Sequence, residues 1–205
     1  MERQGSLFSP RFRRWALAGA ALGIGLTPAA ANAACSSTPV SKPFKRFADT
    51  ANYSLAPGGA FETGTSGWSL TNAAVTAGNE TYFANDQADS HSLAIAPNGV
   101  AVSAPICVGI DHPQFRFFAR RTSGLWAVML VKLRWTDTGG TQRETTVGAL
   151  NGLSLAWAPT PPMQLATALP LRDAQSLSVR VVFDPEDYGG AWAIDDLFVD
   201  PYRKS

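Results

Sequence analysis

Alternation of apolar and polar residues with a period of two dominates the second half of the chain and limits what it can fold into. Over residues 125–135 the apolar side chains take one face, while Lys132 and Arg134 take the other. The same alternation runs through 115–120 and again through 177–183. A period of two with one polar face is typical of antiparallel sheets that pack on a core.

Glycine, proline and asparagine separate these segments. Pro97-Asn98-Gly99 predicts a turn, and Thr138-Gly139-Gly140 predicts a hairpin. Further strands are accordingly expected at 92–96, 100–108, 141–150 and 191–199. No sustained helical period follows the N-terminal segment, and only 161–171 is ambiguous. The sequence therefore predicts an all-β fold, an antiparallel two-sheet β-sandwich of the jelly-roll type.

The first 33 residues have the order of a secretory signal peptide. Four arginines precede an uncharged, mostly apolar run at 15–26, and Ala31-Asn32-Ala33 supplies a cleavage site. The run is too short to cross a hydrocarbon core of about 30 Å as a helix. We therefore expect a secreted or extracytoplasmic protein with no transmembrane segment in the mature chain; a retained anchor is the alternative. Arg13-Arg14 leaves twin-arginine export open beside the ordinary route.

Cleavage after Ala33 would leave an irregular leader at 34–54 and a β-sandwich domain at 55–202. Loss of four arginines and one glutamate changes the formal charge from +1 to −2, and nothing indicates nucleic acid as a partner. The mature chain keeps Cys35 and Cys107, and an even pair in an exported protein predicts a disulfide rather than two free thiols. That bridge would close a loop of about 70 residues and stabilise by about 4 kcal/mol in the chain-entropy model.

Two local patterns at opposite ends of the domain are similar to a known family. The first is Pro57-Gly58-Gly59-Ala60-Phe61-Glu62-Thr63-Gly64, followed by Gly67-Trp68, and the second is Ala193-Ile194-Asp195-Asp196-Leu197-Phe198-Val199-Asp200. Together they resemble the opening and closing strands of galactose-binding-like jelly rolls, especially the carbohydrate-binding modules appended to bacterial glycosidases. Gly58 or Gly59 replaces the usual asparagine-glycine start. The chain also looks like a short secreted bacterial protein, since no enzyme domain accompanies the module. The resemblance implies a non-catalytic module that binds glycan.

The paired aspartates at 195 and 196 interrupt the alternation of the last strand. Ile194 and Leu197 are both apolar but three apart, which predicts a β-bulge between them. In the resembling modules the matching glutamate and terminal aspartate help to bind a structural calcium, which implies Glu62 and Asp196 here, with Asp195 as a further ligand. Backbone carbonyls would complete such a hard-cation site. The alternative is that these carboxylates accept hydrogen bonds from turn amides without a metal.

Cations gather on the solvent-facing side of the predicted strands. Phe118 and Trp126 share the register of these cations, so one sheet face is expected to be basic and to carry aromatic surface. Such a face would bind a saccharide or an anionic envelope polymer. The alternative is a solvated face whose arginines pair with Glu144 and loop carboxylates. The predicted ligand-binding residues are Arg116, Phe118, Arg120, Trp126, Lys132 and Arg134.

No catalytic motif supports an enzyme. The chain lacks G-x-S-x-G, H-E-x-x-H, C-x-x-C and a phosphate-binding glycine loop, and His91 and His112 are its two histidines. We therefore predict a non-enzymatic module for glycan or envelope polymer. The first alternative is a structural or interaction protein of the cell envelope without a small-molecule site, and the more remote one is a hydrolase.

Overall fold

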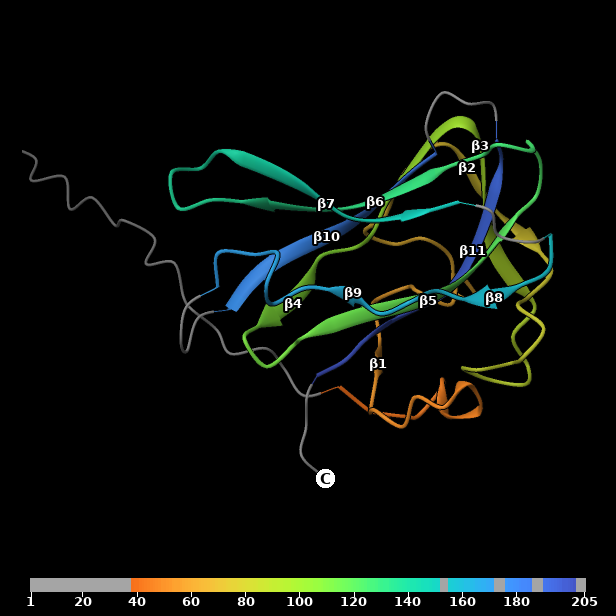
Figure 1. Cartoon of the computed structure of the whole chain (residues 1–205), viewed down its shortest axis with the longest axis horizontal. Coiled ribbons are helices and arrows are strands. Elements are labelled where there is room, and N and C mark those ends of the chain that lie inside the picture. The colour runs from red at the N-terminus through yellow and green to blue at the C-terminus, as the bar shows by residue number, and fades with distance from the viewer. Residues whose placement is uncertain (1–37, 152–154, 172–175, 186–189, 202–205) are drawn as a thin grey trace, which may run out of the picture. The chain divides into compact units, whose positions relative to one another are not determined.

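The computed structural model describes residues 38–151, 155–171, 176–185 and 190–201. The predicted signal peptide and Cys35 lie outside these residues. The signal peptide and the disulfide between Cys35 and Cys107 therefore remain predictions. The elements are one 3₁₀ turn, η1 (Lys45–Phe47), and the strands β1 (Ser54–Leu55), β2 (Ser69–Ala77), β3 (His91–Val102), β4 (Ile106–Gly109), β5 (Gln114–Arg121), β6 (Met129–Thr136), β7 (Gln142–Leu150), β8 (Ala158–Pro159), β9 (Met163–Gln164), β10 (Ser176–Pro185) and β11 (Trp192–Val199) (Figure 1). Within the described ranges, no helix is long and apolar enough to span a membrane.

All strand pairs are antiparallel, and the sheet curls over to form a jelly-roll sandwich, which confirms the predicted fold class. The main order is β7-β6-β10-β3-β11-β5-β8, with β4 beside β10, β2 beside β3, and β1 and β9 beside β11 and β5. Strand β3 belongs to both layers. Its C-terminal end, Ala101 and Val102, pairs with β10, whereas Leu93–Ile95 pairs with β11.

The predicted turn at Pro97-Asn98-Gly99 is wrong, because these residues lie inside the continuous strand β3. The chain bends there without reversing, since β2 pairs with β3 on both sides of the bend and only the register shifts. Asn72 and Asn98 take left-handed backbone angles with φ of 46° and 58°. A Cβ on Gly99 would lie 2.6 Å from the Asn72 carbonyl oxygen, so this close approach requires glycine.

The predicted apolar faces of β6 and β10 form the main core. Met129, Val131 and Leu133 are buried on β6, and β10 pairs with β6 along seven residues in register. On β10 the residues Val179, Val181 and Phe183 alternate along the strand and are buried in the same core. The other side of these two strands therefore faces away from the core.

A second, smaller core lies on the outer side of β5 and β11. The leader crosses this side (Figure 1, orange), and Ser41 forms a two-way backbone bridge with Tyr53. Phe44 stacks on Phe118 with ring centroids 5.3 Å apart. The leader thus covers one sheet, while the outer side of β6 and β10 has no such cover among the described residues. The buried residues of this second core are Phe44, Tyr53, Phe118, Trp157, Ala193 and Phe198.

Candidate functional site

Polar side chains line the outer side of β6, β7 and β10. The strand register places Arg134 opposite Arg180 on β10 and opposite Glu144 on β7. Their chain neighbours Leu133 and Val181 are buried, so the alternation turns both guanidinium groups outward. We call this surface the open face, made by Lys132, Arg134, Thr136, Gln142, Glu144, Ser178 and Arg180.

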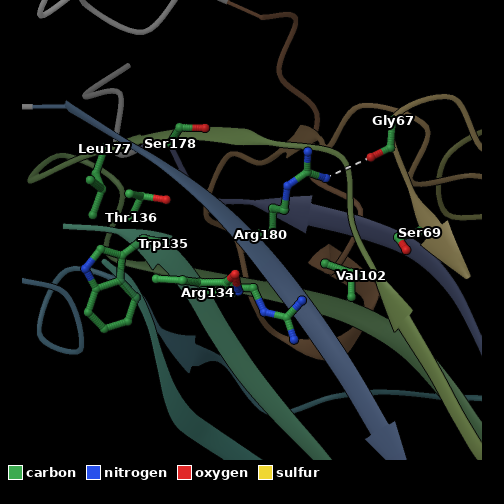
Figure 2. A pocket seen from close by; sticks show the side chains of 10 residues that line it. Gly67, Ser69, Val102, Arg134, Trp135, Thr136, Leu177, Ser178 and Arg180 are labelled. Atoms are coloured by element: carbon green, nitrogen blue, oxygen red, sulfur yellow. Dashed lines mark hydrogen bonds between the residues drawn. The ribbon is translucent and has the colours of Figure 1, made fainter. Parts of the chain in front are cut away.

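A hollow of about 440 Å³ opens at the Thr136 end of the open face, a volume within the range of small-ligand sites. Figure 2 shows Arg134 and Arg180 on neighbouring strands, with Trp135 at one end of the hollow and Gly67 at the other. The indole Nε1–H of Trp135 is buried without a hydrogen-bond partner among the described residues. The hollow is lined by Gly67, Ser69, Val102, Arg134, Trp135, Thr136, Gln142, Leu177, Ser178 and Arg180.

Two cations of the open face are neutralised by carboxylates. The Arg134 Nε donates to Glu144 Oε2 at 2.8 Å. The Lys132 Nζ lies 2.6 Å from Asp184 Oδ2 and 3.7 Å from Glu144 Oε1. This arrangement is the paired face that the sequence offered as the alternative to a basic surface. The open face is therefore polar rather than strongly charged.

Arg180 is held by backbone carbonyls instead. Its Nη1 donates to the Gly67 oxygen at 2.8 Å and to the Ser103 oxygen at 2.6 Å. No carboxylate of the described ranges forms an ion pair with it. The guanidinium is thus fixed in place in the lining of the hollow, so binding to it would carry little ordering cost.

Two of the six predicted ligand residues, Arg116 and Phe118, are buried and do not lie on the exposed face on which they were expected. Phe118 is fully buried and Arg116 is 7% exposed, because the leader covers the outer side of β5. The Arg116 Nη1 lies 2.6 Å from Asp49 Oδ2, and its Nε donates to the Thr160 oxygen at 2.8 Å. The guanidinium also lies 4.3 Å from the ring centre of Phe44. Arg116 and Phe118 therefore hold the leader in place.

The remaining predicted residues fall into three places. Arg120 lies on β5, with its guanidinium 5.0 Å from the ring centre of Trp157. Lys132 and Arg134 lie on the open face. Trp126 is 80% exposed and precedes β6, outside the lining of the hollow. The structure thus brings together only Lys132 and Arg134 of the predicted set.

Glu62 accepts hydrogen bonds from backbone amides at the start of β3, instead of joining the paired aspartates in one metal site. Its carboxylate accepts hydrogen bonds from the backbone N–H groups of Ser90 and His91, at 2.8 and 2.6 Å. Burial would raise the pKa of Glu62, but the hydrogen bonds from the His91 ring and these amides outweigh it and hold the pKa below its usual value. This contact is the metal-free alternative that the sequence left open.

The register shift between Asp195 and Phe198 confirms the predicted β-bulge in β11. At this bulge Asp195, Asp196 and Glu80 form a group of buried carboxylates. Asp195 Oδ2 accepts from the Glu80 N–H at 2.9 Å, and Asp196 Oδ2 accepts from the Asn85 N–H at 3.1 Å. Burial, followed by the neighbouring Asp196 charge, raises the pKa of Asp195 to about 9. Burial, followed by the Glu80 charge, raises the pKa of Asp196 to about 8. Burial also raises the pKa of Glu80.

One oxygen of this group is available to a cation. Asp196 Oδ1 is buried and has no hydrogen-bond partner in the described part of the chain, and the same holds for Asn79 Oδ1 in the loop that follows β2. Across the described residues, no three acidic, histidine or cysteine side chains are arranged to hold a metal by themselves. Asp196 Oδ1 and Asn79 Oδ1 are the unpartnered oxygens that a hard cation could use, and the described side chains do not form a complete site. Glu80 and Asp195 would supply charge rather than a complete ligand shell.

The Ser90, His91 and Glu62 side chains lie close together but lack the geometry of a catalytic triad. Ser90 Oγ and Glu62 Oε2 both approach the same ring nitrogen, His91 Nδ1, at 3.0 and 2.9 Å. A nucleophile and an orienting acid must use opposite nitrogens of the imidazole. This arrangement therefore ties the Glu62 loop to β3 and does not activate the serine.

Arg180 and Glu80 are the important residues that the site prediction omitted. Arg180 alternates with buried Val179 and Val181, and that pattern alone places it on an outer face. That Arg134 lies beside Arg180 follows only from the register between β6 and β10, and no local sequence pattern gives that register. Glu80 carries no sequence signal, because it becomes buried only through contact with a strand 115 residues later.

Comparison with solved structures gives the same fold. The tandem of CBM22 modules from Paenibacillus barcinonensis Xyn10C matches with a TM-score of 0.51 and 15% identity, over 73% of this chain and 44% of that one. The single CBM22-1 xylan-binding domain of the same protein matches with a TM-score of 0.50 and 14% identity, over 71% and 93%. A match to the Clostridium thermocellum Xyn10B CBM22-1-GH10 structure spans only 26% of that chain, with a TM-score of 0.47 and 11% identity. No protein-family model and no curated protein matches the sequence. The chain therefore has the jelly-roll fold of carbohydrate-binding modules.

Proposed function

We propose that this protein is an exported, non-catalytic module that binds an uncharged polysaccharide on the open face. The observation that carries the proposal is the hollow lined by Arg134, Arg180, Ser178 and Gln142, where fixed N–H donors lie beside hydroxyl and amide groups. The hydroxyl groups of a pyranose ring can bond to such polar side chains. Trp135 lines one end of the hollow while its ring packs against the main core, so the hollow would bind a sugar through hydrogen bonds.

The charge balance of the open face favours an uncharged ligand over an anionic envelope polymer. Lys132 and Arg134 are already paired with Asp184 and Glu144. An anionic polymer would compete with these carboxylates and experience little net field. Hydroxyl groups instead can use the N–H donors that the ion pairs leave unoccupied.

The fold likeness adds support without naming the ligand. One matching structure is described as a xylan-binding domain, and its likeness to this chain concerns the fold. Proteins that share one fold can have different functions, so the argument for saccharide binding depends on the hollow. Export is proposed from the signal-peptide pattern of the first 33 residues.

Binding to a panel of polymers tests the proposal. The purified protein is run in affinity gels that contain xylan, mannan, β-glucan, galactan or an anionic polymer, at low and high salt. We expect retardation by an uncharged polymer that is insensitive to salt. Arg134→Gln and Arg180→Gln should each weaken it about tenfold, the equivalent of about 1.4 kcal/mol. Arg46→Gln, on the leader, is the matched control and should bind normally. Absence of binding to every polymer, or binding to the anionic polymer that salt abolishes, would overturn the proposal.

A further inference from the structure

Strand β2 forms an edge of both layers of the sandwich. It pairs with β3 at residues 69–71 and again at 73–77, and no other strand of the described ranges pairs with it. None of its nine residues is buried. In an antiparallel edge strand every second residue directs its N–H and C=O away from the partner strand. The outer side of β2 therefore presents main-chain donors and acceptors that no described strand uses.

This edge lacks the features that normally prevent strands from pairing with another chain. Such features are charged side chains, proline and short length. From Thr63 to Asn79 the chain contains no charged residue and no proline. The other outer strands are protected, because β7 carries Arg143 and Glu144, β4 has four residues, and β1, β8 and β9 have two each. Strand β2 is thus the long edge that remains open to pairing.

The bulge at Asn72 limits the straight part of this edge. The register shift between Thr71 and Ala73 bends the strand, which leaves residues 73–77 as one extended segment. Five residues of strand span about 17 Å. The exposed side chains of this segment, Ala74, Thr76 and Ala77, are small. They leave room for another strand at the usual spacing of about 4.8 Å.

A second copy of the chain fits this segment. Under a two-fold axis at Val75, antiparallel pairing places Ala73 of one copy opposite Ala77 of the other. Each copy then offers the same donors and acceptors that it receives. Like charges directly opposite each other destabilise a strand pair, and the segment contains none. The edge is therefore complementary to itself.

The surroundings of the two ends of β2 differ in charge. The loop at 78–90, which follows β2, contains three acidic residues and neither lysine nor arginine. Arg46 of the leader lies over the Tyr82 ring of this loop and offsets one of these charges. At the other end, Ser69 lines the hollow together with Arg180. Antiparallel pairing directs the acidic end of each copy toward the basic end of the other, which favours this orientation.

We propose that β2 is an interface at which two copies of this protein join edge to edge, through antiparallel pairing of residues 73–77. A contact of this length buries little surface, and interfaces that bury less than about 1,200 Å² in total are weak and transient. The dimer therefore forms where the protein is concentrated. Self-association through β2 is separate from the proposed saccharide binding and does not depend on it.

Sedimentation velocity over a concentration series tests the interface. We expect the wild-type protein to show a monomer–dimer equilibrium between about 1 µM and about 1 mM, the range of weak association. Ala74→Lys should weaken the dimer about tenfold, because the two-fold axis brings the two lysines to diagonal positions across the pair. Ala149→Lys makes the same change at an exposed alanine of the β7 edge and should associate like the wild type.

Charge reversal at the same position keeps the test independent of folding. Ala74→Glu should also weaken its own dimer, and an equimolar mixture of Ala74→Lys and Ala74→Glu should recover a dimer that neither variant forms alone. A wild type that stays monomeric at every concentration overturns the proposal. A dimer that persists unchanged in both Ala74 variants places the contact elsewhere and overturns it as well. Failure to bind any polysaccharide would leave this interface standing, because the assay contains no saccharide.

Discussion

A buried ion pair between Asp49 and Arg116 joins the leader to β5. The pair is 2.6 Å apart, and Asp49 Oδ2 also accepts from the Tyr53 hydroxyl at 2.8 Å. Burial would raise the pKa of Asp49, but hydrogen bonds from Tyr53, Arg116 and the Ala51 N–H outweigh it and hold the pKa below its usual value. Burial and the Asp49 charge raise the pKa of Tyr53, so the phenol stays protonated and donates. Arg116 therefore has a structural use that removes it from any ligand surface.

The first prediction concerns the pH dependence of this pair. A carboxyl whose pKa is lowered by folding stabilises the native state above its unfolded pKa, about 3.9, and loses that stabilisation as pH falls through the folded value. Asp49→Asn should therefore lower the free energy of unfolding by about 1.5–3 kcal/mol at pH 7. The gap from wild type should shrink below about pH 4. Urea unfolding of both proteins from pH 7 to pH 3 measures it.

Asp111→Asn is the control for that measurement, because the Asp111 side chain is 63% exposed and pairs with His112 alone among the described residues. It should change stability by a few tenths of a kcal/mol at most. A gap between Asp49→Asn and wild type that stays constant down to pH 3 would show that Asp49 contributes through shape rather than through its charge.

At the scale of elements, the bend in β3 allows one strand to serve two sheets. The left-handed angles of Asn72 and Asn98 and the absence of a side chain at Gly99 let β2 and β3 turn together without losing their pairing. A bend of this kind increases the local twist and closes the two layers on one core. The bend is thus the feature that makes a sandwich from a single curled sheet.

Substitution of Gly99 tests this account. In Gly99→Ala the new Cβ would lie 2.6 Å from the Asn72 oxygen and 2.8 Å from the Ala96 oxygen, and both are backbone atoms that cannot step aside. We expect a loss of about 1–3 kcal/mol in the free energy of unfolding. Gly139→Ala, in the β6–β7 hairpin, meets only an Asp137 carboxylate oxygen at 3.3 Å and should cost far less. Equal stability of the two variants would contradict a strained bend.

Strand existence was predictable at this scale, whereas strand termini and bends were not. The alternation of Val179, Val181 and Phe183 reports burial on one face, and β10 forms there. Pro97-Asn98-Gly99 has the composition of a turn. The same residues form a bulge instead, because β2 pairs with β3 both before and after them. Local chemistry indicates a change of direction, and only the tertiary partner decides whether the chain reverses.

Across the whole molecule, the limit of sequence reasoning is the second core. The alternation of β5 predicts one buried face with Phe115 and Phe117, and it assigns Phe118 to solvent. The leader buries Phe118 with Phe44 and Phe198, so both faces of β5 are covered. No local pattern shows that a leader 70 residues earlier packs on this strand. The outer face of β6 has no comparable cover in the described ranges, and Lys132 and Arg134 are partly exposed on it.

The last prediction concerns the buried acids that link the C-terminal strand to the loop after β2. Burial, and after it mutual repulsion, disfavours the charged forms of Glu80, Asp195 and Asp196, so folding is opposed unless protons or a cation neutralise these carboxyls. A divalent cation that binds the folded chain alone would raise stability by about 2.7 kcal/mol at 100 times its Kd. We therefore expect calcium to raise the melting temperature of the wild type by several degrees over a chelator.

Asp196→Asn separates charge from shape in this site. Asparagine tolerates the φ of 50° at this position and keeps the side-chain volume, but it removes a carboxyl whose pKa is raised to about 8 in the folded protein. In chelator at pH 7 the variant should melt above the wild type, because the wild type must take up a proton at this carboxyl on folding and the amide is already neutral. In calcium it should show no further increase, because the unpartnered oxygen belongs to a neutral amide. Glu62→Gln, whose carboxylate binds the Ser90 and His91 amides, should melt lower in both conditions and keep the calcium increment. If calcium and chelator give the same wild-type melt, the acids of β11 act as hydrogen-bond acceptors for the loop and hold no metal.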